Sequence, residues 1–181
     1  MTVGMSIQDG VDVSNIEGKV MAAINDKVLD ALNQQLNYEF HSAFHYLAME
    51  SYFQSIHLKG FGKWMRNQYK EERVHALKIL DYINDRGCRV KLTQIEEPPQ
   101  EWKSPLEAFE DAYRQEQNSS GLINDLVDLS QSERDHATNV FLQWFVQNQV
   151  EEEAMVGSIV EKLRLVGNDQ YGLFLLDRDM A

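Results

Sequence analysis

Residues 88–103 read CRVKLTQIEEPPQEWK, and this stretch decides how the rest of the chain can fold. It has neither a helical nor a strand period, and it holds Pro98 and Pro99, two of the three prolines in the chain. Sixteen residues can span ~50 Å when extended. A loop of this length is uncommon in a compact domain unless it connects two points of the fold that lie far apart. We expect it to run the length of the helices that flank it, so that the helix before it and the helix after it are parallel.

Long proline-free segments lie on both sides of this loop and carry apolar residues at helical spacing. The expected helices cover about residues 25–55, 60–86, 105–131 and 136–165, with a short amphipathic fifth helix at 171–179. The two remaining links are only a few residues long, which predicts antiparallel hairpins. The predicted fold class is therefore all-α: a four-helix bundle with one long crossover and a short C-terminal helix.

Length and charge limit the organisation and the partners of the protein. With 181 residues and a net charge of −12, the chain is expected to form one domain over 25–181. Residues 1–24 form a tail in which Ser14 to Glu17 resembles the start of a short helix. The acidic balance argues against nucleic acid and anionic membranes as partners and favours a cation. The single cysteine, and the lack of a signal sequence or a long apolar run, predict a cytoplasmic protein.

The apolar stripe of each long helix is interrupted by polar residues near the middle of that helix. The interruptions are Glu39 in the first helix, Glu72 with His75 in the second, Glu116 in the third, and Gln149 with Glu152 in the fourth. Taken singly, each has an ordinary reading, as a helix phase assigned wrongly, a solvated charge or a core histidine. Helices of equal length that pack side by side bring their midpoints to one level, so the four interruptions are expected to converge on one buried layer.

Four carboxylates buried together would lose solvation and repel one another. The layer must therefore share protons or bind cations. Two divalent ions supply a charge of about +4, which offsets four carboxylates. Oxygen ligands with one imidazole suit iron or manganese, whereas a structural zinc site favours thiolates. A non-catalytic helical protein whose mid-helix carboxylates share protons stays open as an alternative.

These motifs resemble the iron-oxidising motifs of bacterial non-haem ferritins over about residues 25–178, including the fifth helix. The resemblance implies a ferritin-like fold and a first iron site at Glu39, Glu72 and His75. Glu72 would bridge to a second iron held by Glu116, with Gln149 and Glu152 nearby. Gln149 and Glu152 stand where bacterioferritins carry a second Glu-x-x-His motif, so no haem of that kind is expected.

The resemblance also implies two features outside these ligands. Tyr46, one heptad after Glu39, matches a tyrosine beside the iron site that would bond to a ligand carboxylate; the plain alternative is a core aromatic. A third iron site would use Glu71, Glu151 and Glu152. The family often has an acidic residue where this chain has Asn148, which weakens the case for that third site.

The implied function is iron storage with ferroxidase activity: Fe²⁺ is oxidised by dioxygen to Fe³⁺ and deposited as mineral inside a homo-oligomeric cage of about 24 copies. Phe40, Phe44 and Trp64 lie off the inward stripes and are expected to be exposed subunit contacts. His41, His45 and His57 are expected at the surface or in loops, without a role. The alternative function is a di-iron enzyme that acts on peroxide or an organic substrate, with room for it beside Ala43, Ser119 and Ser120.

Overall fold

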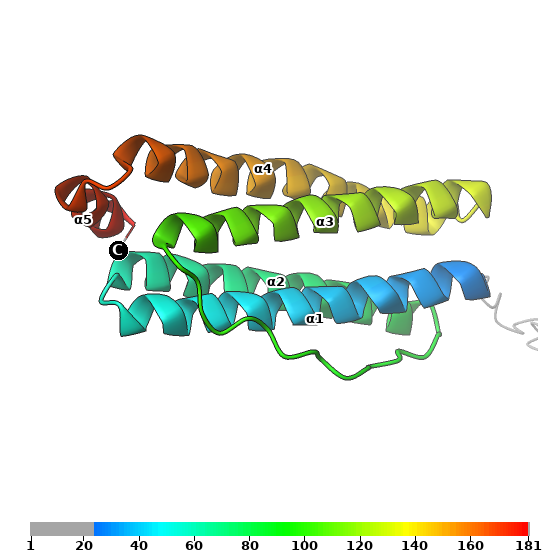
Figure 1. Ribbon diagram of the computed structural model, residues 1–181. Coiled ribbons are helices and arrows are strands. Elements are labelled where there is room, and N and C mark those ends of the chain that lie inside the picture. The colour runs from blue at the N-terminus through cyan, green and yellow to red at the C-terminus, as the bar shows by residue number, and fades with distance from the viewer. Residues whose placement is uncertain (1–23, 181) are drawn as a thin grey trace, which may run out of the picture.

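The computed structural model describes residues 24–180, which form five α-helices and no β-strand (Figure 1). The helices are α1 (Asp26–Ser55), α2 (Lys59–Asp85), α3 (Pro105–Ser132), α4 (His136–Val166) and α5 (Gln170–Asp179). The expected bundle is confirmed, and its helix boundaries agree with the sequence within two residues. The expected short helix near residues 14–17 lies outside the described part of the chain, and the division into a tail and one domain stays a prediction.

The helix starts follow from capping side chains. The Ser104 hydroxyl accepts a hydrogen bond from the Glu107 amide at 3.1 Å, and Pro105 occupies the first turn of α3. The Asn25 side chain accepts from the Lys27 amide at 2.9 Å and begins α1 in the same way. Both starts are readable from the sequence because the capping residue directly precedes an apolar periodic segment.

The crossover follows α1 along the bundle because two asparagines of that helix pair with its backbone (Figure 1). The Lys91 amide donates to Asn33 Oδ1 at 2.6 Å, and the Thr93 amide donates to Asn37 Oδ1 at 2.8 Å. The Asn37 side chain also donates to the Lys91 carbonyl at 2.8 Å. The asparagines thus satisfy backbone groups of a segment without secondary structure.

A polar contact under the end of the crossover corrects one expectation. His45 is buried rather than at the surface, and its Nε2 lies 2.9 Å from Asp111 Oδ2. The Trp102 indole of the crossover donates to the same oxygen at 2.9 Å. These two contacts join α1, α3 and the crossover. Partial burial raises the pKa of Asp111, but the hydrogen bonds with His45 and Trp102 stabilise its carboxylate and lower the pKa to about 2. His57 is exposed, as expected.

Two apolar clusters fill the bundle, one toward α5 and one toward the opposite end. The first includes Tyr46, Phe53, Phe61, Phe109 and Val156. The second includes Leu32, Leu36, Ile79, Ile123 and Leu142. The mid-helix polar residues lie between the two clusters, so the apolar packing on either side fixes the level at which they meet.

Two expectations about side-chain orientation were wrong. Trp64 is half-buried and packs against other rings: its ring centroid lies 5.3 Å from that of Phe109 and 6.2 Å from that of Tyr46. Phe40 is also half-buried, and of the three proposed contacts Phe44 alone is exposed, at 45%. On α3, the three- and four-residue spacing around Glu116 predicts that Tyr113, Ser120 and Val127 face inward. The buried face is instead turned toward Ala112 and Ser119, and those three residues are half-buried.

The helices do not approach one another equally. Each hairpin packs tightly, α1 on α2 and α3 on α4, and the hairpins meet through α1 and α3, while α2 and α4 stay further apart. The short α5 crosses the end of the bundle, where Asp177 Oδ1 accepts from the Phe61 amide at 2.8 Å. Gly60 permits this approach, since a Cβ there would lie 1.7 Å from the Asp177 carbonyl oxygen. Among residues 24–180, none of the helices is long and apolar enough to cross a membrane.

Replacing Asn37 with Ala is expected to loosen the crossover while leaving the bundle folded. The variant loses two hydrogen bonds to the loop, which predicts a destabilisation of about 1 kcal/mol. Hydrogen exchange should accelerate at the Thr93 amide, whose acceptor is removed. Gln34→Ala, at an exposed position on the same helix, is the control, and equal exchange at Thr93 in both variants would contradict this account.

Candidate metal centre

Six polar residues meet between the apolar clusters, and every long helix contributes at least one. Their side chains come from α1 (Glu39), α2 (Glu72 and His75), α3 (Glu116) and α4 (Gln149 and Glu152). Each of the six is between 1% and 5% exposed. The convergence expected from the sequence is therefore present in the structure, and the carboxylates are withdrawn from solvent.

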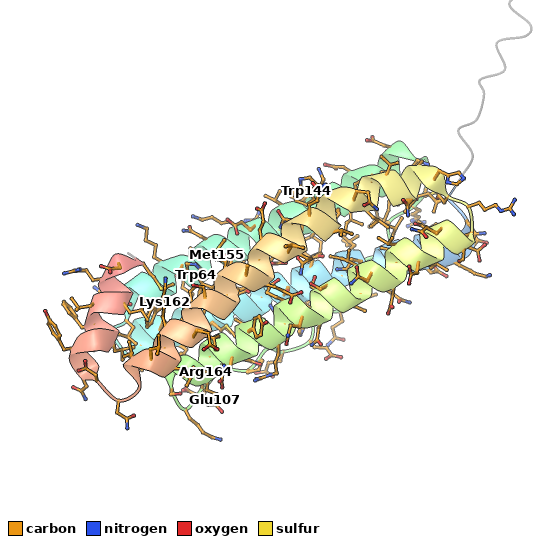
Figure 2. The ribbon with its side chains drawn as sticks, turned by 90° about the horizontal axis from the view of Figure 1, so that it is seen from above. Trp64, Glu107, Trp144, Met155, Lys162 and Arg164 are labelled. Carbon is orange, nitrogen blue, oxygen red and sulfur yellow. The ribbon has the colours of Figure 1, made fainter. Side chains whose placement is uncertain are left out.

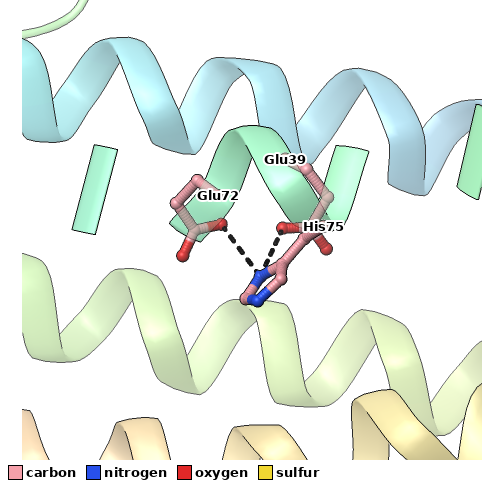
Figure 3. Close-up of side chains that lie close together, drawn as sticks. All are labelled: Glu39, Glu72 and His75. Carbon is pink, nitrogen blue, oxygen red and sulfur yellow. Dashed lines mark ion pairs between the residues drawn. The ribbon is translucent and has the colours of Figure 1, made fainter. Parts of the chain in front are cut away.

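One half of the layer joins α1 to α2. His75 Nδ1 lies 3.7 Å from Glu72 Oε2 and 3.9 Å from Glu39 Oε2, and Figure 3 shows both carboxylates directed at the same ring nitrogen. The Gln35 amide donates to Glu39 Oε1 at 2.6 Å and so leaves the other oxygen to face His75. Glu39, Glu72 and His75 offer three ligand atoms within 4.8 Å of one another, close enough for a single metal ion.

The other half of the layer joins α2 to α3 and α4. Glu72, Glu116 and Glu152 also offer ligand atoms within 4.8 Å of one another. Glu72 belongs to both groups, which is the placement required of a carboxylate that bridges two ions. The Tyr46 hydroxyl donates to Glu116 Oε1, the kind of contact expected for this tyrosine. Gln149 Nε2 lies 3.4 Å from Glu116 Oε2 and donates to the Glu116 carbonyl at 3.2 Å.

Burial dominates the electrostatics of the layer. It raises the pKa values of Glu39 and Glu72 well above the ordinary glutamate range, and the negative charges of neighbouring carboxylates raise them further. Burial also raises the pKa of Glu116, and it raises the pKa of Glu152 to about 8. Burial therefore favours the protonated forms of these acids, whereas a divalent ion would stabilise the ionised forms.

The chemistry of the side chains fits a metal ion. Glu152 Oε2 is buried without a hydrogen-bond partner, which is unusual for a carboxylate oxygen. Four carboxylates with one imidazole form the hard, oxygen-rich set that suits iron or manganese. The layer can therefore hold two cations that share Glu72.

The two outer acidic residues lie apart from this layer. Glu71 and Glu151 are exposed and line a hollow of about 480 Å³ that also reaches Asn148, His75 and Glu152. The hollow opens between α2 and α4, where Trp144 and Met155 mark its α4 side (Figure 2). The buried layer is thus reached from the surface on the side where the two hairpins are furthest apart.

Two amide side chains form contacts with the carboxylates that were not predicted from the sequence. Gln35 precedes Glu39 by four residues, and Asn148 precedes Glu152 by four residues, so each amide lies one helical turn from its carboxylate. This four-residue spacing indicates that each amide can reach its carboxylate. Amides are common on helix surfaces, however, and only the structure establishes that these two point inward.

A one-crossover bundle that gathers carboxylates and histidine at its midpoint has the architecture of ferritin-like di-metal proteins. A family model for the ferritin-like domain matches residues 29–166. Bacterial non-heme ferritins of Staphylococcus saprophyticus and Bacteroides fragilis are 42% and 40% identical to this chain. Each similarity covers 87% of this chain, and 95% and 98% of the respective relative. The chain belongs to the ferritin family.

Solved structures agree with this assignment. An open pore ferritin from the hyperthermophilic archaeon Archaeoglobus fulgidus superposes with a TM-score of 0.86 at 52% sequence identity. The match covers 87% of this chain and 98% of the archaeal chain.

The raised pKa of Glu152 predicts how the stability of the metal-free protein depends on pH. Between the ordinary value near 4.5 and about 8, folded Glu152 keeps a proton that the unfolded chain has lost. Its contribution is therefore most favourable at low pH and declines as pH rises through this window. Glu152→Gln should flatten that decline by on the order of 1–4 kcal/mol between pH 5 and 8.

Urea unfolding of chelator-treated protein at several pH values measures this effect. Glu151→Gln is the control, because the Glu151 side chain is exposed to solvent. If the parent and the Glu152→Gln variant lost stability equally as pH rises, the assignment of a proton to Glu152 would be wrong.

Proposed function

We propose that this protein stores iron: it binds two Fe²⁺ ions at the buried layer, oxidises them with dioxygen and deposits Fe³⁺ mineral inside a hollow homo-oligomeric cage. The observation that carries the proposal is the buried layer itself, in which four carboxylates and one histidine from four helices meet with Glu72 at their centre. Membership of the ferritin family and the names of the bacterial relatives support the same function.

The proposed ligands divide between two iron positions. Glu39, Glu72 and His75 hold the first Fe²⁺. Glu72 bridges to the second, which Glu116 binds with Glu152 and with Gln149 nearby. The outer position formed by Glu71 and Glu151 with Glu152 is proposed as a weaker third site, because two of its carboxylates remain in water. The departure from a Glu-x-x-His motif at Gln149 supports a centre without haem.

The layer favours oxidation because anionic ligands stabilise Fe³⁺ more than Fe²⁺. Two adjacent ions give up one electron each, and dioxygen accepts both electrons with two protons to form hydrogen peroxide. Protons held by the buried carboxylates leave as the cations bind, since the charge of the metal replaces them. Burial between the two apolar clusters keeps the charges in a medium of low dielectric, where these interactions are strong.

Tyr46 is proposed as an auxiliary electron donor. Its hydroxyl bonds to Glu116, so the phenol can lose an electron while its proton passes to that carboxylate. This step supplies one electron when the irons at the site provide one electron fewer than the reduction of dioxygen requires. The same hydrogen bond orients Glu116, so Tyr46 acts on ligand geometry as well.

The proposed assembly is a closed cage of about 24 copies. Exposed Phe44 is a candidate contact between copies, and the net charge of −12 favours attraction of cations and mineral nucleation. We assign the protein to the cytoplasm and residues 25–181 to one iron-binding domain, with residues 1–24 as a tail. Neither nucleic acid nor a membrane is a proposed partner.

A second candidate function is a di-iron enzyme that acts on peroxide or an organic substrate. The hollow beside His75 and Glu152 favours it, because its volume of about 480 Å³ could admit a small molecule. Particle mass separates the two functions: storage requires a cage, whereas a monomer or dimer near the chain mass of 21.0 kDa would favour the enzyme. A non-catalytic helical protein would show no thermal stabilisation by Fe²⁺ or Zn²⁺.

Replacing Glu72 with Ala should abolish the fast phase of Fe²⁺ oxidation, because both iron positions lose a ligand. The fold should persist, because the variant removes one buried acid and with it the unfavourable free energy of burying that group beside other acids in the metal-free protein. Stopped-flow absorbance after aerobic Fe²⁺ addition measures the rate. Asp81→Ala, an exposed carboxylate on the same helix, is the control, and a Glu72→Ala variant as fast as this control would exclude the di-iron site.

Replacing Tyr46 with Phe should leave iron binding and assembly intact but slow turnover or change the dioxygen consumed per Fe²⁺. The substitution removes one hydroxyl and keeps the ring within the apolar cluster. Oxygen uptake and electron paramagnetic resonance measure the effect. Unchanged stoichiometry and rate, with no tyrosyl radical in the parent, would reduce Tyr46 to a packing role.

A further inference from the structure

Asn148 on α4 contacts two of the proposed ligands from the outer side of the layer. Its side-chain amide donates to Glu152 Oε1 at 2.6 Å and lies 3.4 Å from His75 Nε2. The same ring nitrogen lies 3.5 Å from Glu152 Oε1. A single neutral side chain thus joins α4 to α2 at the point where the hollow meets the buried layer.

This contact gives the two oxygens of Glu152 different surroundings. Oε1 is held by the amide, whereas Oε2 is buried without a partner. Glu152 also belongs to the group formed with Glu72 and Glu116, whose ligand atoms lie within 4.8 Å. Tethering Oε1 by Asn148 therefore leaves Oε2 as the oxygen available to a cation in the layer.

The two ring nitrogens of His75 also face different groups. Its Nδ1 faces Glu39 and Glu72, where the first cation is proposed, and its Nε2 faces Asn148 and Glu152. A histidine that binds a metal through one nitrogen is oriented by a polar partner at the other. An imidazole that binds a metal through Nδ1 carries its proton on Nε2, so the acceptor on this side is Glu152 Oε1 at 3.5 Å, and the Asn148 amide acts by holding that oxygen in place.

We propose that Asn148 is a positioning residue that commits Glu152 and His75 to the two inner cations and keeps the outer position weak. An ion in the hollow would need Glu152 Oε1, which already accepts a hydrogen bond, and it would meet an N–H donor. Its remaining carboxylates, Glu71 and Glu151, are exposed to water, where their attraction for a cation is screened. This inference rests on the proposed two-ion function and deepens it.

Anaerobic titration of the full-length, metal-free protein with Co²⁺ tests the proposal, because Co²⁺ reports coordination by its absorption spectrum. We expect two tight ions per chain in the parent. Asn148→Ala should weaken the second ion by about 10-fold or more, the usual effect of removing a group that orients a ligand. Asn148→Asp replaces the donor with a carboxylate and should add a third tight ion with a new set of absorption bands.

Gln147→Ala, at the adjacent exposed position, is the matched control and should behave as the parent. Circular dichroism and native mass verify that each variant is folded and assembled. If Asn148→Ala binds both ions as the control does, and Asn148→Asp gains no third ion, the positioning role is overturned while the two-ion function stands. If the parent itself binds fewer than two ions, the proposed function fails, and this inference fails with it.

Discussion

The structure depends on one constraint: four carboxylates lie in a single buried layer, and their mutual repulsion must be neutralised. Glu39, Glu72, Glu116 and Glu152 are each no more than 4% exposed, and burial raises the pKa of every one. A hydrophobic core gains nothing from such a layer, because desolvating the acids opposes folding. A bound cation would offset this cost, and the layer offers two groups of side chains that could hold a metal ion, which is why it indicates function rather than packing.

The rest of the fold closes this layer along the bundle axis and leaves a hollow beside it between α2 and α4. Apolar clusters lie above and below it, so water reaches the carboxylates poorly along the bundle axis. The crossover runs over α1 and is held by Asn33 and Asn37, which makes the second and third helices parallel and brings all four midpoints to one level. The wider spacing of α2 and α4 leaves the hollow through which ions can reach His75 and Glu152.

Much of this arrangement could be predicted from the sequence because it follows from chain length and helical period. The crossover length set the topology, the cap at Ser104 located the start of α3, and the mid-helix acids gave the level of the site. The sequence could not give rotations about each helix axis, which depend on neighbouring helices. The buried face of α3 was therefore misjudged, and Trp64 was expected at the surface although it packs beside Phe109.

Contacts between polar residues that lie far apart in the chain, or that belong to no recognisable motif, could not be predicted from the sequence either. Nothing in the chain indicated that His45 would be buried against Asp111 under Trp102, because these residues meet only after the crossover returns. Gln35 and Asn148 had the correct spacing to reach their carboxylates, but the inward direction of their side chains is a product of packing. Which of the gathered residues bind iron stays a prediction of the chemistry.

The most direct measurement of the central claim is aerobic addition of Fe²⁺ to the metal-free protein, with ferric absorbance and native particle mass followed on the same sample. The account predicts rapid oxidation of the first two Fe²⁺ per chain, carried out by a particle many times heavier than the 21.0 kDa chain, followed by continued uptake of iron. Oxidation no faster than that of Fe²⁺ in protein-free buffer would contradict it.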